Sequence, residues 1–145
     1  DDILNNTNFR LVNETNVELN KLSYKHQVNP REINIFYLSE NERNKIEKPV
    51  EAQYIAALHY EIERFSPNVV LRPLYQQKIL PNIAYIGGPN EIAYWLQYKK
   101  MFDHHKINFP VLMLRNSVLW IDEKTSGLMK KMKINEAEIF KILTQ

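Results

Sequence analysis

The sequence predicts an α/β fold in which a partial parallel sheet is flanked by helices. Residues 82–86 form a short apolar run, a Gly-Gly-Pro-Asn turn leads into helical sequence over residues 91–105, and a second apolar run occupies residues 111–114. A strand, a crossover helix and a strand joined by short loops are typical of a βαβ unit with parallel strands. A further apolar run, residues 33–38, is expected to be a strand of the same sheet, covered on both faces.

The first part of the chain, residues 8–65, is interpreted as a lead-in of helices around the strand at 33–38. Apolar residues recur at helical spacing in two stretches, residues 9–24 and 55–65. After the strand, residues 40–48 are expected to form a short polar helix, because a serine stands at its N-cap position.

The region from residue 66 to residue 121 carries the motifs. An Arg-Pro pair begins a predicted helix over residues 72–80, since proline is tolerated in the first helical turn. Residues 118–121 are expected either to continue the strand at 111–114 or to pair beside it.

The remainder, residues 122–145, is interpreted as a helical tail. Asn135 can cap a final helix over Glu136–Leu143, and Glu138 stands where a capping-box carboxylate belongs. Because this helix begins with a strong signal and stops soon afterwards, the sequence is interpreted as one internal piece of a larger protein. The alternative is a trimmed but complete small domain.

Composition excludes several classes of function. The chain is 44% hydrophobic and 25% charged with a net charge of +2, which is ordinary for a soluble globular protein. It has no run of like charge, so neither nucleic acid nor a membrane is an expected partner. The absence of cysteine excludes a thiolate metal site, and the histidine spacing predicts no zinc site. A cytoplasmic location is the default expectation.

The glycine turn is the first candidate for ligand binding. Gly87 and Gly88 are expected to allow positive φ angles and a close approach of a ligand to the backbone. The helix start around Asn90 offers unpaired N–H groups and the positive end of the helix dipole, which favour an anion. The alternative is a purely structural turn. Glu91 is expected to stabilise the helix dipole or to accept a hydrogen bond from a substrate.

Arginines near the same crevice are the second candidate. Arg115 directly follows the second strand, and Arg72 lies in an apolar neighbourhood, so the two guanidinium groups are expected to clamp carboxylate or phosphate oxygens. The alternative is a pair of structural arginines. Asn116 and Ser117 extend the polar cluster, although Ser117 has no evident base partner, and Tyr94 is expected to frame a pocket wall.

An ordered series of motifs resembles the bacillithiol biosynthesis cysteine-adding enzymes. The resemblance runs over most of the chain but covers only a central minority of a family member. It is carried by the motifs Gln27–Asn34, Phe36–Leu38, Phe65–Val69, Leu71–Gln76, Leu80–Pro81, Ala84–Pro89, Glu91–Gln97, Phe102, Pro110–Val111 and Arg115–Ser117.

This resemblance implies a Rossmann-like core similar to those of nucleotidyltransferases and class I aminoacyl-tRNA synthetases. It implies a ligase that joins L-cysteine to glucosaminyl-malate, with an adenine nucleotide (ATP or ADP) as the expected cofactor. The full-length enzyme is expected to be a homodimer through a coiled coil absent from this chain, and the isolated piece to be inactive.

The resemblance also adds Gln76 to the expected binding residues, which are Arg72, Gln76, Gly87, Gly88, Asn90, Glu91, Tyr94, Arg115, Asn116 and Ser117. Two positions depart from the family pattern. Asn90 stands where glycine is common and is expected to keep the turn by adopting positive φ, and Gln77 stands where a carboxylate is common. No catalytic acid, base or nucleophile is assigned. The competing interpretations are a non-catalytic α/β binding module and a different nucleotide-binding transferase.

Overall fold

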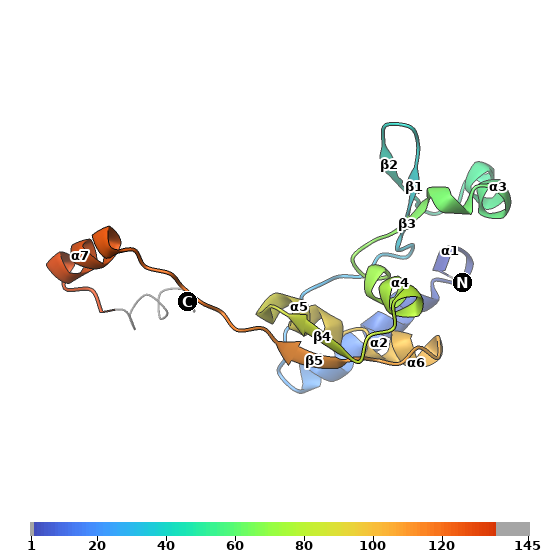
Figure 1. Cartoon of the computed structure of the whole chain (residues 1–145). Helices are drawn as coiled ribbons and strands as arrows, with labels where there is room; N and C mark the ends of the chain where they lie inside the picture. Colours follow the sequence, from blue (N-terminus) through green and yellow to red (C-terminus); the bar gives the residue numbers. More distant parts are fainter. Residues whose placement is uncertain (1, 136–145) are drawn as a thin grey trace. The chain divides into compact units, whose positions relative to one another are not determined.

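The computed structural model describes residues 2–135, which divide into two units (Figure 1). The first unit extends to Arg115 and the second begins at Asn116. The predicted final helix, Glu136–Leu143, lies outside the described residues.

The parallel pair of strands is confirmed. Strand β4 (Ala84–Gly87) pairs in parallel with β5 (Val111–Leu114), with Ala84 opposite Val111 and Gly87 opposite Leu114. Helices α5 (Pro89–Leu96) and α6 (Lys99–His104) connect them (Figure 1).

The connecting helix is interrupted, whereas the sequence predicts one continuous helix over residues 91–105. The break falls at Gln97 and Tyr98, whose N–H groups donate to the carbonyls of Tyr94 and Trp95 in the tighter i→i−3 pattern. The buried Gln97 side chain turns away to bond the loop at residues 27–28. These bonds lie outside the helix, so local periodicity does not reveal them.

The strand predicted at 33–38 forms, but the prediction that it belongs to the parallel sheet is wrong. Strand β1 (Ile35–Leu38) is the centre of a separate sheet, between β2 (Arg43–Lys45) and β3 (Phe65–Pro67), and both pairings are antiparallel. An apolar run predicts burial, but it does not identify the neighbouring strand.

The polar helix predicted over residues 40–48 is also wrong. This segment makes a hairpin instead, in which the Ser39 N–H donates to the Glu42 carbonyl at 3.0 Å. Strand β2 then runs back along β1, and Ile46 beyond it is almost fully buried. Burial of Ile46 together with strand pairing outweighs the weak helical preference of the polar residues.

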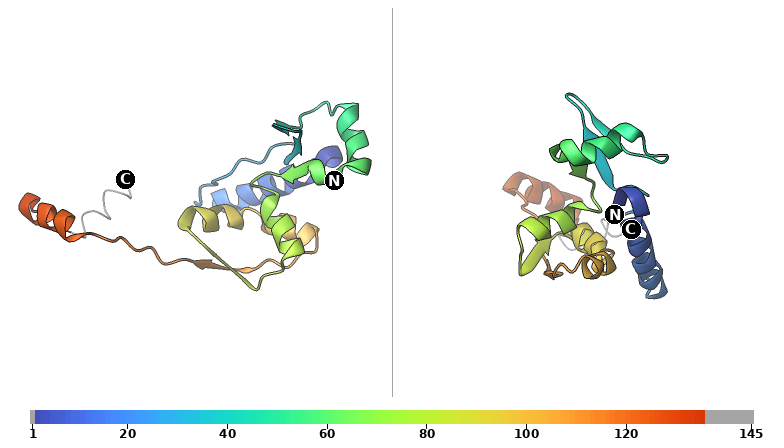
Figure 2. Two further views of the ribbon diagram at one scale, coloured as in Figure 1. Left: turned by 45° about the horizontal axis from the view of Figure 1, so that its top comes forward. Right: turned by 90° about the vertical axis from the view of Figure 1, so that its right-hand side faces the viewer.

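Further helices support the two sheets. They are α1 (Asp2–Asn5), α2 (Thr7–Lys21), α3 (Ala52–Tyr60), the 3₁₀ helix η1 (Ile62–Arg64) and α4 (Arg72–Ile79). The helix predicted to reach residue 65 ends earlier, because Phe65 pairs with Tyr37 in the antiparallel sheet. Helix α3 lies beside that sheet (Figure 2), and the rings of Tyr54 and Tyr37 are 5.3 Å apart.

Two apolar clusters form the core of the first unit. The larger one centres on Trp95, Tyr98, Met101 and Phe102 of the α5–α6 segment and includes Val12 of α2. The smaller one joins Ile3, Ile33 and Ile46 to residues of α3 and the antiparallel sheet. The larger cluster therefore fixes the helices on the parallel strands.

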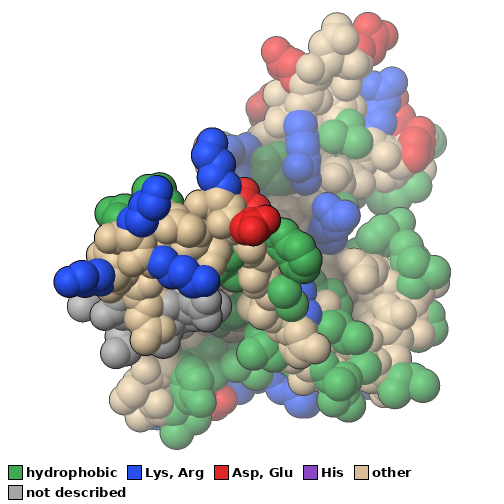
Figure 3. All heavy atoms as spheres, turned by 60° about the vertical axis from the view of Figure 1, so that its left-hand side comes forward, with side chains coloured by type: hydrophobic (Ala, Val, Ile, Leu, Met, Phe, Trp, Pro, Cys, Tyr) green, Lys and Arg blue, Asp and Glu red, His purple; other side chains and the backbone are tan. Residues whose placement is uncertain are grey.

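The second unit contains α7 (Glu123–Met132). Asp122 caps it by accepting a hydrogen bond from the Thr125 N–H at 2.6 Å, and hydrogen bonding to Thr125 holds the pKa of Asp122 below its usual value. Lysine side chains are prominent on this unit (Figure 3).

The sequence predicts that residues 118–121 continue strand β5 or pair beside it, but these residues form no strand. Over residues 2–135, no helix combines the length and apolarity needed to span a bilayer.

Candidate ligand-binding site

A cavity of about 470 Å³ lies in the first unit, between the helices of the parallel motif and the antiparallel sheet. Four of the residues predicted from sequence line it, namely Arg72, Gln76, Glu91 and Tyr94. The remaining lining residues are Arg43, Pro67, Asn68, Val69, Pro73, Tyr85 and Trp95. The volume lies within the range of small-molecule sites.

The start of α4 positions Arg72. The side-chain oxygen of Asn68 accepts hydrogen bonds from the N–H groups of Val70 and Leu71, at 2.9 and 3.2 Å, and the Arg72 N–H donates to the Asn68 carbonyl. Asn68 therefore fixes the turn from which Arg72 projects. Within residues 2–135, no hydrogen bond or ion pair engages the Arg72 guanidinium.

The glycine turn differs from its prediction. None of the glycines in the described part of the chain has a positive φ, and Gly88 is extended, at φ −70° and ψ 170°. Asn90 lies in the first turn of α5 and does not adopt positive φ either, so both expectations are wrong. The reason is that the chain passes directly from an extended residue into the helix.

The glycines serve instead to leave space for side chains. A Cβ on Gly87 would lie 2.8 Å from the Tyr85 ring, and a Cβ on Gly88 would lie 3.2 Å from the Arg115 guanidinium. Gly87 and Gly88 are both buried. The sequence predicts that a ligand approaches the backbone closely here. In the structure, the side chains of Tyr85 and Arg115 occupy that space instead.

Glu91 closes the turn. Its carboxylate accepts a hydrogen bond from the Gly88 N–H at 2.7 Å and one from the Tyr85 hydroxyl at 3.3 Å, and Arg115 lies 4.0 Å away. The backbone hydrogen bond is the main reason that the pKa of Glu91 is lowered. The stabilisation is therefore present above the ordinary glutamate pKa and is lost as pH falls through the lowered value. Glu91 thus accepts a hydrogen bond from the N–H group of the N-cap residue and stabilises the start of α5, which is the first of the two roles expected for it.

Arg115 adjoins the turn but is separate from the cavity lining. Its N–H donates to the Gly87 carbonyl at 2.9 Å, which continues the parallel ladder past β5, and its guanidinium faces Glu91. Asn116 and Ser117 are exposed residues at the beginning of the second unit. Among the described residues, Arg115 is thus linked to the cavity lining through Glu91.

The second guanidinium at the cavity belongs to Arg43, which sequence reasoning missed. Arg43 lies on β2, with its guanidinium 4.0 Å from the centre of the Phe36 ring. It donates to the Pro67 carbonyl at 2.9 Å and to the Ser66 hydroxyl at 3.3 Å. Nothing in the local sequence distinguishes Arg43 from its charged neighbours, because only strand pairing brings it here.

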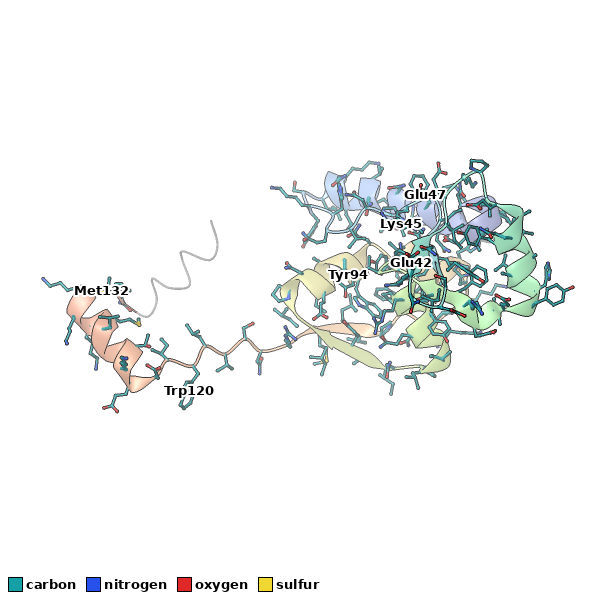
Figure 4. The ribbon with its side chains drawn as sticks, turned by 90° about the horizontal axis from the view of Figure 1, so that it is seen from above. Glu42, Lys45, Glu47, Tyr94, Trp120 and Met132 are labelled. Carbon is teal, nitrogen blue, oxygen red and sulfur yellow. The ribbon has the colours of Figure 1, made fainter. Side chains whose placement is uncertain are left out.

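Tyr94 provides a neutral wall. Burial, followed by the influence of Tyr85, raises the pKa of Tyr94 to about 12, so its hydroxyl keeps its proton near neutral pH. Tyr94 projects from α5 (Figure 4). Two arginines and one carboxylate leave the cavity with an excess positive charge, which favours an anionic ligand.

Gln77, the second departure from the family pattern, has a structural position. It is buried, and its side-chain amide donates to the Asn82 carbonyl at 2.8 Å. This bond ties the end of α4 to the segment that precedes β4.

Within residues 2–135, no group of three or more His, Cys, Asp or Glu residues is arranged to hold a metal ion, and His104 and His105 belong to no such group.

Parallel strands joined by helices, with a glycine turn at their carboxyl ends, define a Rossmann-like α/β domain. Residues 1–116 match the family model described as "Bacillithiol biosynthesis BshC, N-terminal Rossmann-like domain". The chain belongs to this family.

Curated relatives support the same assignment. Three proteins named "Putative cysteine ligase BshC" are 49%, 38% and 35% identical to this chain over 130, 152 and 128 residues, in Flavobacterium psychrophilum, Christiangramia forsetii and Chlorobaculum tepidum. The alignments cover 81%, 96% and 78% of this chain, but 24%, 28% and 23% of those proteins. The chain therefore spans about a quarter of the length of these relatives.

Proposed function

We propose that the protein containing this chain joins L-cysteine to glucosaminyl-malate, and that this chain contributes one wall of the substrate site. The observation that carries the proposal is the cavity lined by Arg72, Gln76, Glu91 and Tyr94, within the segment that matches the family. The names of the relatives support a cysteine ligase. The glucosaminyl-malate acceptor and a homodimer formed through a coiled coil outside this chain are parts of the same proposal.

The chemistry requires an activated carboxylate on cysteine and an amine that attacks it. An adenine nucleotide would supply the activating group. The Gly88 N–H is a poor phosphate donor, because Glu91 already accepts its hydrogen bond. The glycine turn therefore does not fit the phosphate chain of a nucleotide.

Within the cavity, the residues have complementary roles in the proposal. The Arg72 guanidinium stabilises negative charge on a bound acid, and the Gln76 amide and the Tyr94 hydroxyl offer neutral hydrogen bonds. Glu91 orders the turn and can accept a hydrogen bond from an amine or hydroxyl of the ligand. These groups bind and orient substrates, and none is assigned as a general acid or base.

The test is bacillithiol formation by the full-length protein, with L-cysteine, glucosaminyl-malate and ATP as substrates and mass spectrometry as the readout. Arg72→Ala is expected to lower kcat/KM about 10- to 100-fold, because it removes charge-assisted hydrogen bonds. Arg10→Ala is the matched control, since Arg10 is exposed and pairs with Glu14 on α2. Unaltered product formation in Arg72→Ala would contradict the proposed site.

A non-catalytic binding module is the second candidate. The hydrogen bond from the Gly88 N–H to Glu91 favours it, because a turn closed by its own side chain needs no ligand. This candidate predicts ligand binding by the full-length protein with no condensation of the two substrates in the same assay.

A further inference from the structure

We infer that Arg43 is a substrate-binding residue that forms, with Arg72, a clamp for the carboxylates of the acid-bearing substrate. This inference rests on the proposed function and deepens it, since it assigns the cavity to the malyl part of glucosaminyl-malate. Arg43 comes from the hairpin strand β2, outside the parallel motif.

The first argument is that the Arg43 side chain is held in place. One face of the Phe36 ring lies 4.0 Å from its guanidinium, and the Arg31 guanidinium lies 4.8 Å from the same ring. Hydrogen bonds to Pro67 and Ser66 fix it further. A guanidinium ordered before binding loses less conformational entropy when a ligand arrives.

The second argument is that donor groups are left over. A guanidinium has five N–H donors, and the two hydrogen bonds described for Arg43 both use Nη2. The Arg72 guanidinium makes no hydrogen bond or ion pair with any residue between 2 and 135. Two cations with spare donors therefore face one cavity, which matches a ligand with more than one anionic oxygen pair.

The third argument favours carboxylates over a nucleotide phosphate chain. Glu91 also lines the cavity, and the lowered pKa of Glu91 keeps it ionised at neutral pH. Phosphate oxygens placed beside the Glu91 carboxylate are repelled by it, whereas an amine or hydroxyl group in the same place donates a hydrogen bond to it. A ligand that combines carboxylates with amine or hydroxyl groups therefore suits this cavity better than a phosphate chain does.

The experiment measures binding to the full-length protein by calorimetry, with glucosaminyl-malate, glucosamine and ATP as separate probes. Arg43→Ala is expected to weaken glucosaminyl-malate binding about 10- to 100-fold and to leave ATP affinity within twofold. Glucosamine lacks the malyl carboxylates, so its weak binding should not change. Lys45→Ala is the matched control, because Lys45 lies on the same strand (Figure 4) and outside the cavity lining.

Unchanged glucosaminyl-malate affinity in Arg43→Ala overturns the inference, and so does a loss that falls on ATP instead. If Arg43→Ala does not fold, Arg43→Lys decides, since it keeps the charge but loses the planar fork. Selective weakening of glucosaminyl-malate binding then supports the clamp, and unchanged affinity overturns it.

Failure of the proposed function has a different signature. In that case the wild-type protein makes no bacillithiol, whereas L-malate, used alone as a probe, still binds in a manner that depends on Arg43. If L-malate binding to the wild-type protein is absent or does not depend on Arg43, the clamp is overturned whatever the ligase assay shows.

Discussion

At the scale of single residues, Gly87 shows that the sequence can identify an important position and yet suggest the wrong physical reason for its importance. The sequence suggests a glycine with positive φ, but the described glycines have ordinary backbone angles. What Gly87 provides is space for the Tyr85 ring, which stacks on Trp95 with ring centres 4.3 Å apart. A side chain at this position would push Tyr85 away from Trp95 and from Glu91.

Gly87→Ala is therefore expected to destabilise the first unit by about 1–3 kcal/mol, the usual cost of overpacking. Chemical denaturation followed by tryptophan fluorescence measures it, since Trp95 lies beside the altered ring. Gly127→Ala is the control, because no heavy atom lies within 4 Å of a Cβ added there. Equal stability of the Gly87→Ala and wild-type proteins would disprove the steric role.

At the scale of elements, Gln97 decides where the crossover helix breaks. Its side-chain oxygen accepts hydrogen bonds from the N–H groups of Gln27 and Val28, at 2.9 and 3.0 Å. Its amide nitrogen donates to the Val28 carbonyl and to Asn16, at 2.8 and 2.7 Å. One fully buried side chain thus joins three parts of the chain: α2, the loop at 27–28 and the α5–α6 junction.

Gln97→Leu keeps the approximate volume but leaves those partners without their hydrogen bonds. We expect a loss of about 2–4 kcal/mol in the free energy of unfolding, because buried polar groups without partners are costly. Gln53→Leu on α3 is the control, since Gln53 is exposed and bonds only Glu51 among the described hydrogen bonds. Urea denaturation of both variants compares them, and similar losses would argue against a special role for Gln97.

At the scale of the whole molecule, the parallel pair β4–β5 has one covered and one open face. Tyr85 and Leu112 pack into the larger core cluster. On the opposite face, Ile86, Val111 and Met113 are 64%, 62% and 50% exposed. An uncovered apolar sheet face favours association with other apolar surfaces.

The isolated chain is accordingly expected to self-associate as its concentration rises. Met113→Lys should reduce this association, because a charge on the open face must be desolvated to bury that face. Met132→Lys, at a similarly exposed methionine on α7, should leave it unchanged. Sedimentation velocity at several concentrations distinguishes the two. An equal effect of both variants would show that the open face is not the surface involved.

The boundaries of strand β5 and the start of α4 could be predicted from sequence, because apolar runs and an Arg-Pro pair act locally. The hairpin around Arg43 could not, since its residues are polar and their strand conformation depends on pairing with β1. The same limitation applied to the site. Arg72, Gln76, Glu91 and Tyr94 were found through motifs in one region, whereas Arg43 belongs to another sheet.

The sequence by itself determined the parallel strand–helix–strand unit, the glycine turn and the resemblance to its family. These depend on periodicity and residue order, which are properties of neighbouring residues. Only the tertiary structure decided that strand β1 belongs to a separate antiparallel sheet, that Glu91 closes the turn, and that Arg43 faces the cavity with Arg72. Such features depend on contacts between residues far apart in the chain, and local patterns carry no information about which distant partner a residue will meet.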